Sequence, residues 1–593
     1  MAKLQKVFFL CIFLTYIPDA FSQKTADTKY WIIFKDKGEF KPEMVIENGS
    51  IAYEKGKELL TDRAVKRRLK VLSENTLIDF GDLPLNTEYV SGIKNLGILT
   101  VAESRWLNGI SAYMTNDLLD KVKAMDYVSQ IKAVNKLYKQ EINLPQTNYL
   151  PENNHSSDTQ NVYNYGNSLK QMLTVNVPKV HNLDITGKGV LIASFDDGFD
   201  WKNHESLRNL KVTGEYDFIN EDVNTFAEKN QKYPDENKQG AHGTATLSSM
   251  SGYKEGKLIG PAFDSEILLA KTEYVTSETP MEEDFWLEAA EWAEAKGADI
   301  ITSSLIYKQY DEPYQNNSYT YDNFDGKTAI TTIAADRSAY LGIVVCQAMG
   351  NYNQTAIPSL GSAADGDSII SVGAITFSGD PATFTSNGPT KDGRIKPDVV
   401  APGVSIYVAT VKEISGDNAS YEYSSGTSFS TPITAGIAAL ILSAHPELTP
   451  MQVRDALRNT ASMSNNPNNI LGWGNINAYD AVLYFGPAWS NSPEFKFSGN
   501  ETEVSTYLAS KDLINPNSVK FFYSLDGGMS YENIKLSLSE PNGDRNNSGK
   551  YSAVLKNVPD VYKTKYYFSA QDYNGNKSVY PGDAISKTDV GNN

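Results

Sequence analysis

Three short segments of the sequence carry side chains that together could attack a carbonyl carbon. Asp196 comes shortly after the apolar run 190–193, His242 stands between glycines in Gly-Ala-His-Gly, and Ser428 lies in Ser-Ser-Gly-Thr-Ser-Phe-Ser-Thr-Pro. A serine hydroxyl becomes a good nucleophile only when a base takes its proton, and an imidazole can do this near neutral pH. A carboxylate fixes the tautomer of that imidazole and stabilises its charged form. The segments therefore predict a Ser-His-Asp triad with Ser428 as the nucleophile.

Asn351 is a fourth candidate, because it follows the apolar run 343–345 in the sequence Ala-Met-Gly-Asn. The oxyanion that forms on an attacked carbonyl needs hydrogen-bond donors aimed at it. The side-chain amide of Asn351 offers two N–H groups. The backbone N–H of Ser428, at the predicted start of a helix, offers another. We therefore expect these two residues to share an oxyanion-binding role.

Each segment also has a purely structural interpretation. An Asp before Gly is common in turns, a lone histidine is more often structural, and Ser, Thr and Pro are the usual residues at a helix N-terminus. The catalytic interpretation rests on the presence of all the segments together, in the chain order Asp, His, Asn, Ser.

The candidate residues lie in a region, 169–486, in which predicted strands and helices alternate. The runs 190–193 and 343–345 are continuously apolar, which is typical of strands buried on both faces of a parallel sheet. A helical pattern covers 285–295, between those two runs. The alternation predicts a three-layer α/β domain with a parallel sheet. Because the carboxyl ends of parallel strands face one crevice, such a sheet would bring the candidate side chains together.

Two further units and a linker flank this region. Residues 23–137 mix strand and helix patterns, including a basic helix at 60–72, and predict a small α+β unit. Residues 487–593 carry short aromatic strands between Asp-Gly and Asn-Gly turns, which predict an all-β sandwich. The stretch 138–168 is rich in Asn, Gln, Ser, Thr and Pro, so we expect an exposed linker that is open to proteolysis.

The N-terminal residues 1–22 have the pattern of a secretory signal peptide. Two lysines precede the apolar core 7–17, and Ala20 and Ser22 are small residues suited to cleavage. The core is too short for a membrane anchor, and Cys11 lacks the small residues that would precede a lipid-anchored cysteine. No later segment is expected to be long and apolar enough to cross a membrane. We expect the protein to be exported, to the periplasm, the cell surface or the medium.

Composition narrows the partners further. A chain of 593 residues is expected to form about two to four domains. Its net charge of -18 argues against nucleic acid and anionic membrane surfaces as partners. Removal of the signal peptide leaves Cys346 as the single cysteine, so no disulfide can form within the mature chain. Cys346 lies in an apolar run and is expected to be a buried, inert thiol.

With these segments in view, the sequence resembles the subtilisin family (subtilases) of secreted bacterial serine endopeptidases. The stretch from Gly187 to Gly198 is similar to the family's aspartate motif, His242-Gly-Thr to its histidine motif, and Gly426-Thr-Ser-Phe-Ser-Thr-Pro to its serine motif. Other similar stretches begin at Ser386, Ser443 and Gly472. The likeness covers about 165–485.

The resemblance implies hydrolysis of peptide bonds in protein or peptide substrates by Asp196, His242 and Ser428, with Asn351 in the oxyanion hole. It implies no cofactor for the chemistry. It also implies a substrate-binding surface, for which the candidates are Ser304, Leu305, Ile306 and Gly350.

The resemblance further implies a zymogen. Residues 23–137 would be an inhibitory, chaperone-like propeptide, and the linker 138–168 would contain the maturation region. The catalytic domain would be 169–486, and 487–593 would be an appended Ig- or fibronectin-like module.

Three residues depart from the family pattern. Asp197 replaces the usual Ser or Thr after the catalytic aspartate, and we expect it to be structural or solvated. Ile306 replaces the usual Gly of the substrate-binding strand, so it is expected to narrow the first specificity pocket or to tilt the strand. Met349 replaces a small residue before Gly350.

The sequence does not identify a metal site. Asp322, Asp325, Asn316 and Asn317 carry oxygen ligands that calcium prefers, but they show no ligand spacing of a known calcium loop. A structural calcium ion is left open, and no metal ligand is predicted.

Two other functions are considered. A catalytically silent subtilase-fold protein that binds partners at the cell surface would need a lost triad or oxyanion residue, and none is lost here. A carbohydrate-binding protein is suggested by the aromatic residues of 487–593, although such residues are usually core residues in a sandwich.

Overall fold

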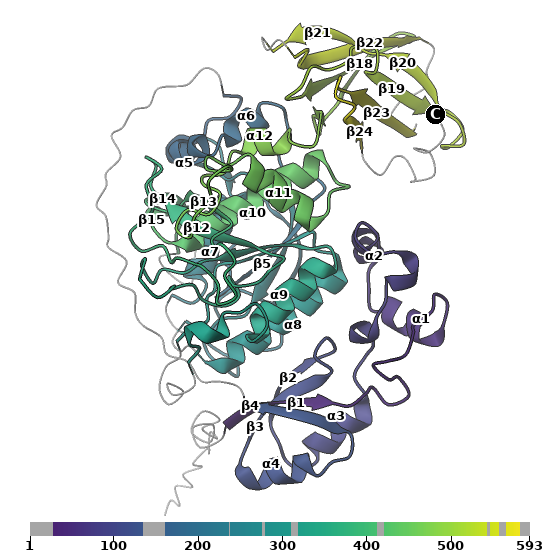
Figure 1. Cartoon of the computed structure of the whole chain (residues 1–593). Coiled ribbons are helices and arrows are strands. Elements are labelled where there is room, and N and C mark those ends of the chain that lie inside the picture. Colours follow the sequence, from purple (N-terminus) through teal and green to yellow (C-terminus); the bar gives the residue numbers. More distant parts are fainter. Residues whose placement is uncertain are drawn as a thin grey trace, which may run out of the picture.

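The computed structural model describes residues 28–133, 161–235, 238–275, 279–309, 318–411, 420–542, 546–556 and 565–581. Its centre is a sheet of seven strands, all parallel, in the order β13-β12-β11-β10-β5-β9-β6 (Figure 1). The strands are β13 (Val399–Pro402), β12 (Ile370–Ile375), β11 (Val344–Ala348), β10 (Ile300–Ser303), β5 (Leu191–Asp196), β9 (Glu266–Lys271) and β6 (Lys211–Asp217). The apolar runs at 190–193 and 343–345 fall in or beside β5 and β11, as predicted.

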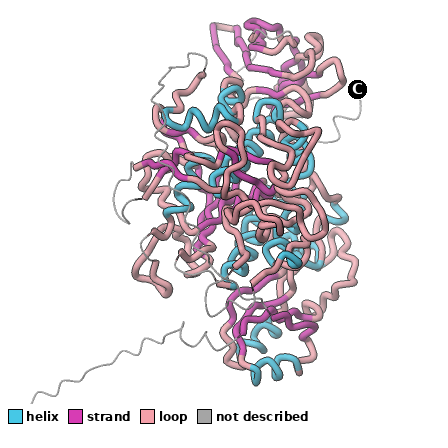
Figure 2. The backbone as a smooth tube through the Cα atoms, turned by 60° about the vertical axis from the view of Figure 1, so that its left-hand side comes forward, coloured by secondary structure: helices cyan, strands magenta, loops and turns pink. Residues whose placement is uncertain are grey.

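Helices cover both faces of this sheet. Helices α7 (Ala241–Ser251) and α10 (Thr427–Ala444) contribute to one hydrophobic core, together with alternate residues of the strands. Helices α8 (Pro280–Lys296) and α9 (Ile330–Tyr340) contribute to a second core on the opposite face. Figures 1 and 2 show the strands between these helices. The predicted three-layer α/β architecture is confirmed.

Helix α10 corrects one expectation. Its 18 residues have a mean hydropathy of 1.4, so by length and composition alone it could cross a membrane. The prediction that no segment after the signal region meets this test was therefore wrong. Every residue of α10 is buried among the strands and helices of the central domain, which is what a core helix requires.

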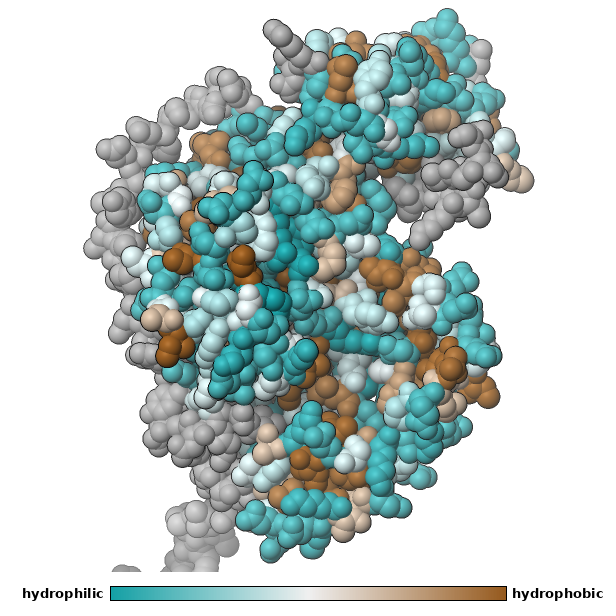
Figure 3. Space-filling view, in the orientation of Figure 1, coloured by the Kyte–Doolittle hydropathy of each residue, from teal (hydrophilic) through white to brown (hydrophobic). Residues whose placement is uncertain are grey.

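The N-terminal unit, residues 28–133, is a small α+β fold as predicted. Its antiparallel sheet has the order β2-β3-β1-β4. The strands are β1 (Thr28–Phe34), β2 (Thr100–Ser104), β3 (Gly109–Met114) and β4 (Val128–Ala133), and the helices are α1 (Ile51–Lys57), α2 (Asp62–Arg68), α3 (Thr87–Lys94) and α4 (Asn116–Lys123). Large apolar side chains are exposed on this unit, among them Val45 and Ile51, and Figure 3 shows apolar patches over it.

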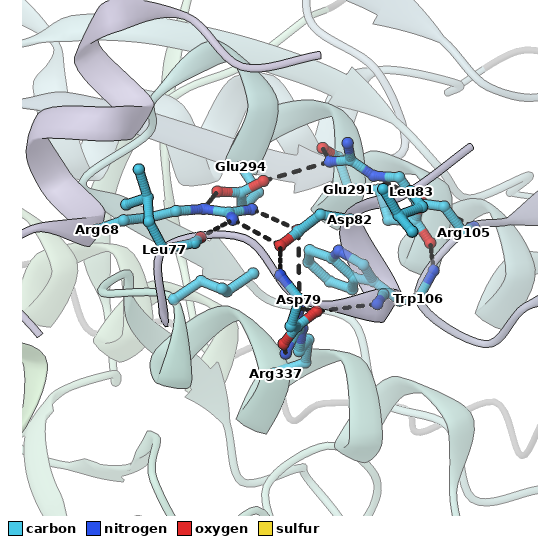
Figure 4. Close-up of polar contacts among 12 residues, drawn as sticks. Arg68, Leu77, Asp79, Asp82, Leu83, Arg105, Trp106, Glu291, Glu294 and Arg337 are labelled. Carbon is cyan, nitrogen blue, oxygen red and sulfur yellow. Dashed lines mark hydrogen bonds and ion pairs between the residues drawn. The ribbon is translucent and has the colours of Figure 1, made fainter. Parts of the chain in front are cut away.

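The N-terminal unit packs on α8 and α9 through a buried network of ion pairs (Figure 4). Arg68 of α2 is fully buried, with Nε 2.7 Å from Glu294 of α8 and Nη2 2.7 Å from Asp82. Arg337 of α9 reaches Asp79 of the N-terminal unit at 2.6 Å. Desolvation would raise the pKa of Glu294, but the charges of Arg67 and Arg68 lower it. A buried charge is costly without a partner. The N-terminal unit supplies Arg68 to Glu294, and the central domain supplies Arg337 to Asp79.

The C-terminal unit is an all-β fold of two antiparallel sheets. One contains β16 (Ala488–Trp489), β17 (Glu494–Ser498), β18 (Glu501–Ala509), β22 (Gly549–Lys556) and β21 (Ser537–Pro541), and the other contains β20 (Glu532–Lys535), β19 (Lys520–Ser524), β23 (Lys565–Gln571) and β24 (Lys577–Tyr580). Trp489, Phe521, Tyr551 and Phe568 are buried in one core between the strands. These aromatic residues are therefore core residues rather than a ligand-binding surface.

Two further predictions, on the linker and on Cys346, can be compared with the structure. Tyr165 and Ser168 are buried, and the Tyr165 hydroxyl lies 2.6 Å from His181 Nδ1, so the prediction that residues 138–168 are exposed was wrong at these two positions. Cys346 is fully buried in β11, as predicted, and desolvation raises the pKa of its thiol. The predicted signal peptide lies outside the described residues, and the domain boundaries stay predictions.

Candidate active site

Asp196 is the last residue of β5, and only 1% of its side chain is exposed. Its Oδ1 atom lies 2.6 Å from Nδ1 of His242, and its Oδ2 atom accepts a hydrogen bond of 2.9 Å from the Thr246 hydroxyl. Both carboxylate oxygens are thus engaged, which fixes the plane of the carboxylate and, through it, the imidazole. Thr246 follows His242 by one helical turn on α7, so the helix presents both partners to the same aspartate.

His242 is the second residue of α7, and 37% of its side chain is exposed. Desolvation would lower the pKa of His242, but the charge and hydrogen bond of Asp196 raise it to about 10. Because more than a third of the side chain is exposed, solvent screens part of this effect. The pKa of His242 nevertheless lies above its ordinary value of 6.5. Within the described part of the chain, His242 Nε2 makes no hydrogen bond. This nitrogen is the one left to exchange a proton.

Asp197 is buried beside the pair rather than solvated. Its Oδ1 accepts a hydrogen bond of 2.7 Å from the backbone N–H of Gly243, and its Oδ2 accepts one of 3.4 Å from that of His242. Desolvation and the charge of Asp196 raise the pKa of Asp197 well above its ordinary value. The carboxyl group therefore holds the first turn of α7, which is the structural role expected of it. A Cβ at Gly243 would lie 2.2 Å from the carbonyl oxygen of Gly198, so this close approach requires glycine.

Ser428 is the second residue of α10 and is 8% exposed. The ring of its neighbour Phe429 lies 6.2 Å from the His242 ring between centroids, which brings the start of α10 beside the imidazole. Among the hydrogen bonds of the described residues, none joins Ser428 Oγ to His242. The first N–H groups of a helix have no acceptor within it, so the Ser428 N–H is available to a ligand.

Asn351 lies next to this helix start, after β11. Its Oδ1 accepts hydrogen bonds from the backbone N–H and the hydroxyl of Thr427, at 2.9 and 3.0 Å. Because the oxygen is engaged, the amide NH2 is the end left to donate. It has no partner among the described residues. Asn351 and the Ser428 N–H are therefore neighbours at one helix start, in the arrangement that binding of an oxyanion needs.

The backbone before Asn351 is shaped by Gly350, whose φ is +107°. A Cβ there would lie 2.9 Å from the Ser386 hydroxyl and 3.0 Å from the Tyr352 ring. Met349, the departure noted in the sequence, is fully buried in the core on the α8 side of the sheet. Its side chain packs on the face of the sheet that α8 and α9 cover.

The candidate substrate-binding residues follow β10. Ser304 Oγ donates a hydrogen bond of 2.9 Å to the carbonyl oxygen of Ser428, which places this strand end beside the serine. Leu305 is buried, and its carbonyl oxygen accepts from the side chain of Gln347. Ile306 is half-buried, and its Cγ2 lies 2.4 Å from where a Cβ of Gly361 would stand. The sequence pointed to these residues but gave no sign of Thr246 and Thr427, whose hydroxyls hold Asp196 and Asn351.

No separate metal centre emerges among the described residues. Side-chain ligand atoms of Asp196, Asp197 and His242 lie within 4.8 Å of one another, but the hydrogen bonds above already use them. Asp322 pairs with Lys391, and Asp325 accepts from the backbone N–H groups of residues 327 and 328. Asn316 and Asn317 lie outside the described residues.

Comparison with known proteins gives two family matches. Residues 187–474 match the model of the subtilase family, and residues 29–148 match that of the peptidase S8 propeptide domain of Bacteroidota. The first match contains all four candidate catalytic residues, and the second contains the N-terminal unit except for its first residue, Thr28.

Individual proteins are similar over the same region. Serine protease AprX of Bacillus subtilis is 31% identical over 321 residues, which are 50% of this chain and 67% of that protein. Subtilisin E of Bacillus subtilis is 30% identical over 337 residues, 56% of this chain and 74% of that protein. Subtilisin of Bacillus pumilus is 31% identical over 290 residues, 49% of this chain and 89% of that protein. A solved protease from Pseudoalteromonas arctica PAMC 21717 superposes with a TM-score of 0.43 and 21% identity, covering 54% of this chain and 98% of that one.

Proposed function

The chain belongs to the subtilase family and is a serine endopeptidase with a propeptide, and on this premise we propose that Asp196, His242 and Ser428 form its catalytic triad. The observation that carries the proposal is the contact of 2.6 Å between Asp196 Oδ1 and His242 Nδ1, at the strand end next to the start of α10. With Nδ1 engaged, Nε2 is the nitrogen that serves as the base.

The reaction begins when His242 Nε2 takes the proton of Ser428 Oγ and the oxygen attacks the peptide carbonyl carbon. The hydroxyl and the imidazole come within bonding reach as substrate fills the site, since catalytic hydrogen bonds are often long in the free enzyme. The carbonyl oxygen becomes an oxyanion, which receives hydrogen bonds from the Asn351 amide and the Ser428 N–H. His242 then returns its proton to the leaving amine, and an acyl-enzyme remains.

Water completes the cycle by the same route. His242 takes a proton from a water molecule, the hydroxide attacks the acyl carbon, and the proton passes to Ser428 Oγ as the acid product leaves. Asp196 keeps its charge throughout and stabilises the imidazolium. No cofactor is needed for these steps. The catalytically silent alternative requires the loss of one of these residues, and the sequence retains them all.

We further propose that the protein is exported and made as a zymogen that processes itself. The signal-like residues 1–22 support export. The match to a propeptide domain supports a zymogen. The N-terminal unit is packed on α8 through the buried pair of Arg68 and Glu294 and on α9 through the partly exposed pair of Asp79 and Arg337, and such packing suits an intramolecular inhibitor.

The test is the fate of a Ser428→Ala precursor. We expect it to fold and to accumulate uncleaved, whereas the wild-type chain is shortened from its N-terminal side. Maturation of the variant at the wild-type rate, with no other protease present, would show that Ser428 is not the nucleophile of this step.

A further inference from the structure

The segment 304–308, which follows β10, presents its side chains to two different environments. Leu305 and Tyr307 are 4% and 1% exposed and lie in the hydrophobic core on the α8 side of the sheet. Ser304, Ile306 and Lys308 are not part of this core, and Ile306 and Lys308 both lie against Gly361, so we place the three residues in one row on the other side of the segment. Ser304 begins this row at the carbonyl of Ser428, at 2.9 Å. The row thus runs outward from the nucleophile.

Ile306, the second member of the row, is packed against Gly361. A Cβ at Gly361 would lie 2.4 Å from Ile306 Cγ2 and 3.6 Å from Lys308 Cβ. The backbones of these two segments are joined by a pair of hydrogen bonds of 3.1 Å between Tyr307 and Ser362. The branched side chain of Ile306 therefore occupies space that a glycine would leave open to a substrate side chain.

Lys308, the third member, turns its ammonium group toward the segment that follows Asn351. Nζ donates a hydrogen bond of 2.8 Å to the carbonyl oxygen of Ser359. It also lies 5.1 Å from the centroid of the Tyr352 ring and 5.7 Å from that of Phe324. The Lys308 ammonium group therefore lies beside the ring of Tyr352, the residue that follows the proposed oxyanion donor in the chain.

This charge has no acidic partner in the described part of the chain, which does not include residues 310–317. Its contacts there are one carbonyl oxygen and two aromatic faces. Desolvation lowers the pKa of Lys308 to about 8, which reflects the cost of holding the cation there. A carboxylate brought to this place by a ligand would offset that cost.

We propose that Lys308 is a specificity residue that favours substrates with an acidic side chain on the residue whose carbonyl is attacked. That carbonyl must lie between Ser428 and Asn351. The side chain of the same residue is therefore the one nearest to the row of Ser304, Ile306 and Lys308. Ile306 limits the depth available to a bulky apolar side chain, and Lys308 supplies a charge for a carboxylate. The inference rests on the proposed function and names the substrate class of the same site.

The test uses peptide p-nitroanilides that differ only in the last residue, Glu or Gln, with the matured protein. These side chains have nearly the same shape and differ in charge, so the ratio of their kcat/KM values isolates the charge effect and is independent of the amount of active enzyme. We expect the wild type to prefer Glu by about tenfold. Lys308→Met is expected to bring the ratio to about one, and Lys308→Arg to keep the preference.

Lys170→Met is the matched control. Lys170 is an exposed lysine whose ammonium also lies over an aromatic ring, that of Phe377 at 5.0 Å, and its replacement removes the same charge elsewhere. We expect this variant to keep the wild-type ratio.

Two results would overturn the inference while leaving the proposed function intact: cleavage of both peptides at equal rates by the wild type, or a Glu preference that survives in Lys308→Met. If neither peptide is cleaved and Ser428 is not labelled by a fluorophosphonate, the proposed function fails, and the inference fails with it.

Discussion

Nδ1 of His242 lies 2.6 Å from Oδ1 of Asp196, while the second oxygen of that carboxylate is held by the hydroxyl of Thr246. The contact joins the end of a central strand to the first turn of α7. It fixes which imidazole nitrogen is left for proton exchange, and it sets the electrostatic environment of the ring. The predictions on catalysis below follow from this one relationship.

The first prediction concerns the pH dependence of kcat/KM. The neutral imidazole is the base, so activity should rise with pH through the pKa of His242. Asp196 stabilises the charged form and raises that pKa from 6.5 to about 10. In Asp196→Asn the stabilising charge is gone, so the rise should move to lower pH, while the maximal rate falls by about 10^3 to 10^4 through loss of the correct tautomer. A profile with the same midpoint in both proteins would contradict the coupling.

The second prediction concerns the oxyanion. Asn351→Ala removes a donor used only when the carbonyl oxygen becomes charged. We expect kcat to fall by about 10^2 to 10^3 with little change in KM. Steady-state kinetics on one peptide ester and one peptide amide would measure this. An unchanged kcat would exclude Asn351 as a donor to the oxyanion.

The third prediction tests the packing of Ile306 on Gly361. Gly361→Ala should destabilise the wild type, because the new methyl group meets Ile306 Cγ2 at 2.4 Å. In an Ile306→Ala background the same change should cost much less, since that methyl group is absent. A double-mutant cycle of unfolding free energies would give a coupling of about 1 to 3 kcal/mol. Additive effects would show that the two side chains are not in contact.

The fourth prediction concerns the buried ion pairs that hold the N-terminal unit on α8. Arg68→Met leaves Glu294 and Asp82 buried with one ion partner fewer, so we expect the stability of that unit to fall by about 3 to 5 kcal/mol. Lys55→Met is the control, because Lys55 pairs with Glu39 at the surface, where such a pair contributes less than about 1 kcal/mol. Hydrogen exchange of the strand amides of residues 28–133, in a Ser428→Ala background, would measure both. Equal protection in the two variants would contradict a buried ion network at this interface.

Several features of the fold could be predicted because they depend on local patterns. The apolar runs at 190–193 and 343–345 predicted β5 and β11, and the parallel sheet explains why Asp196 and Asn351 lie at the same edge. The glycines around His242 allow close backbone approach, and at Gly243 a Cβ would lie 2.2 Å from the carbonyl oxygen of Gly198.

The remaining features depend on tertiary contacts that no local pattern encodes. Thr246 and Thr427 are ordinary helix hydroxyls until the fold sets an aspartate or an asparagine beside them. Arg68 lies in a basic helix that would be expected to face water, yet it is buried because α8 supplies Glu294. Helix α10 is apolar enough by composition to cross a membrane, and its complete burial among the surrounding strands and helices makes it a core helix.

The most direct test of the proposed triad is fluorophosphonate labelling of the matured protein, followed by peptide mapping. The reagent reacts only with a serine whose proton a neighbouring base removes. We predict that the label is found on Ser428, and that His242→Ala abolishes the labelling while the protein stays folded. Labelling of a different residue, or labelling of Ser428 at the wild-type rate without His242, would contradict the assignment of the triad.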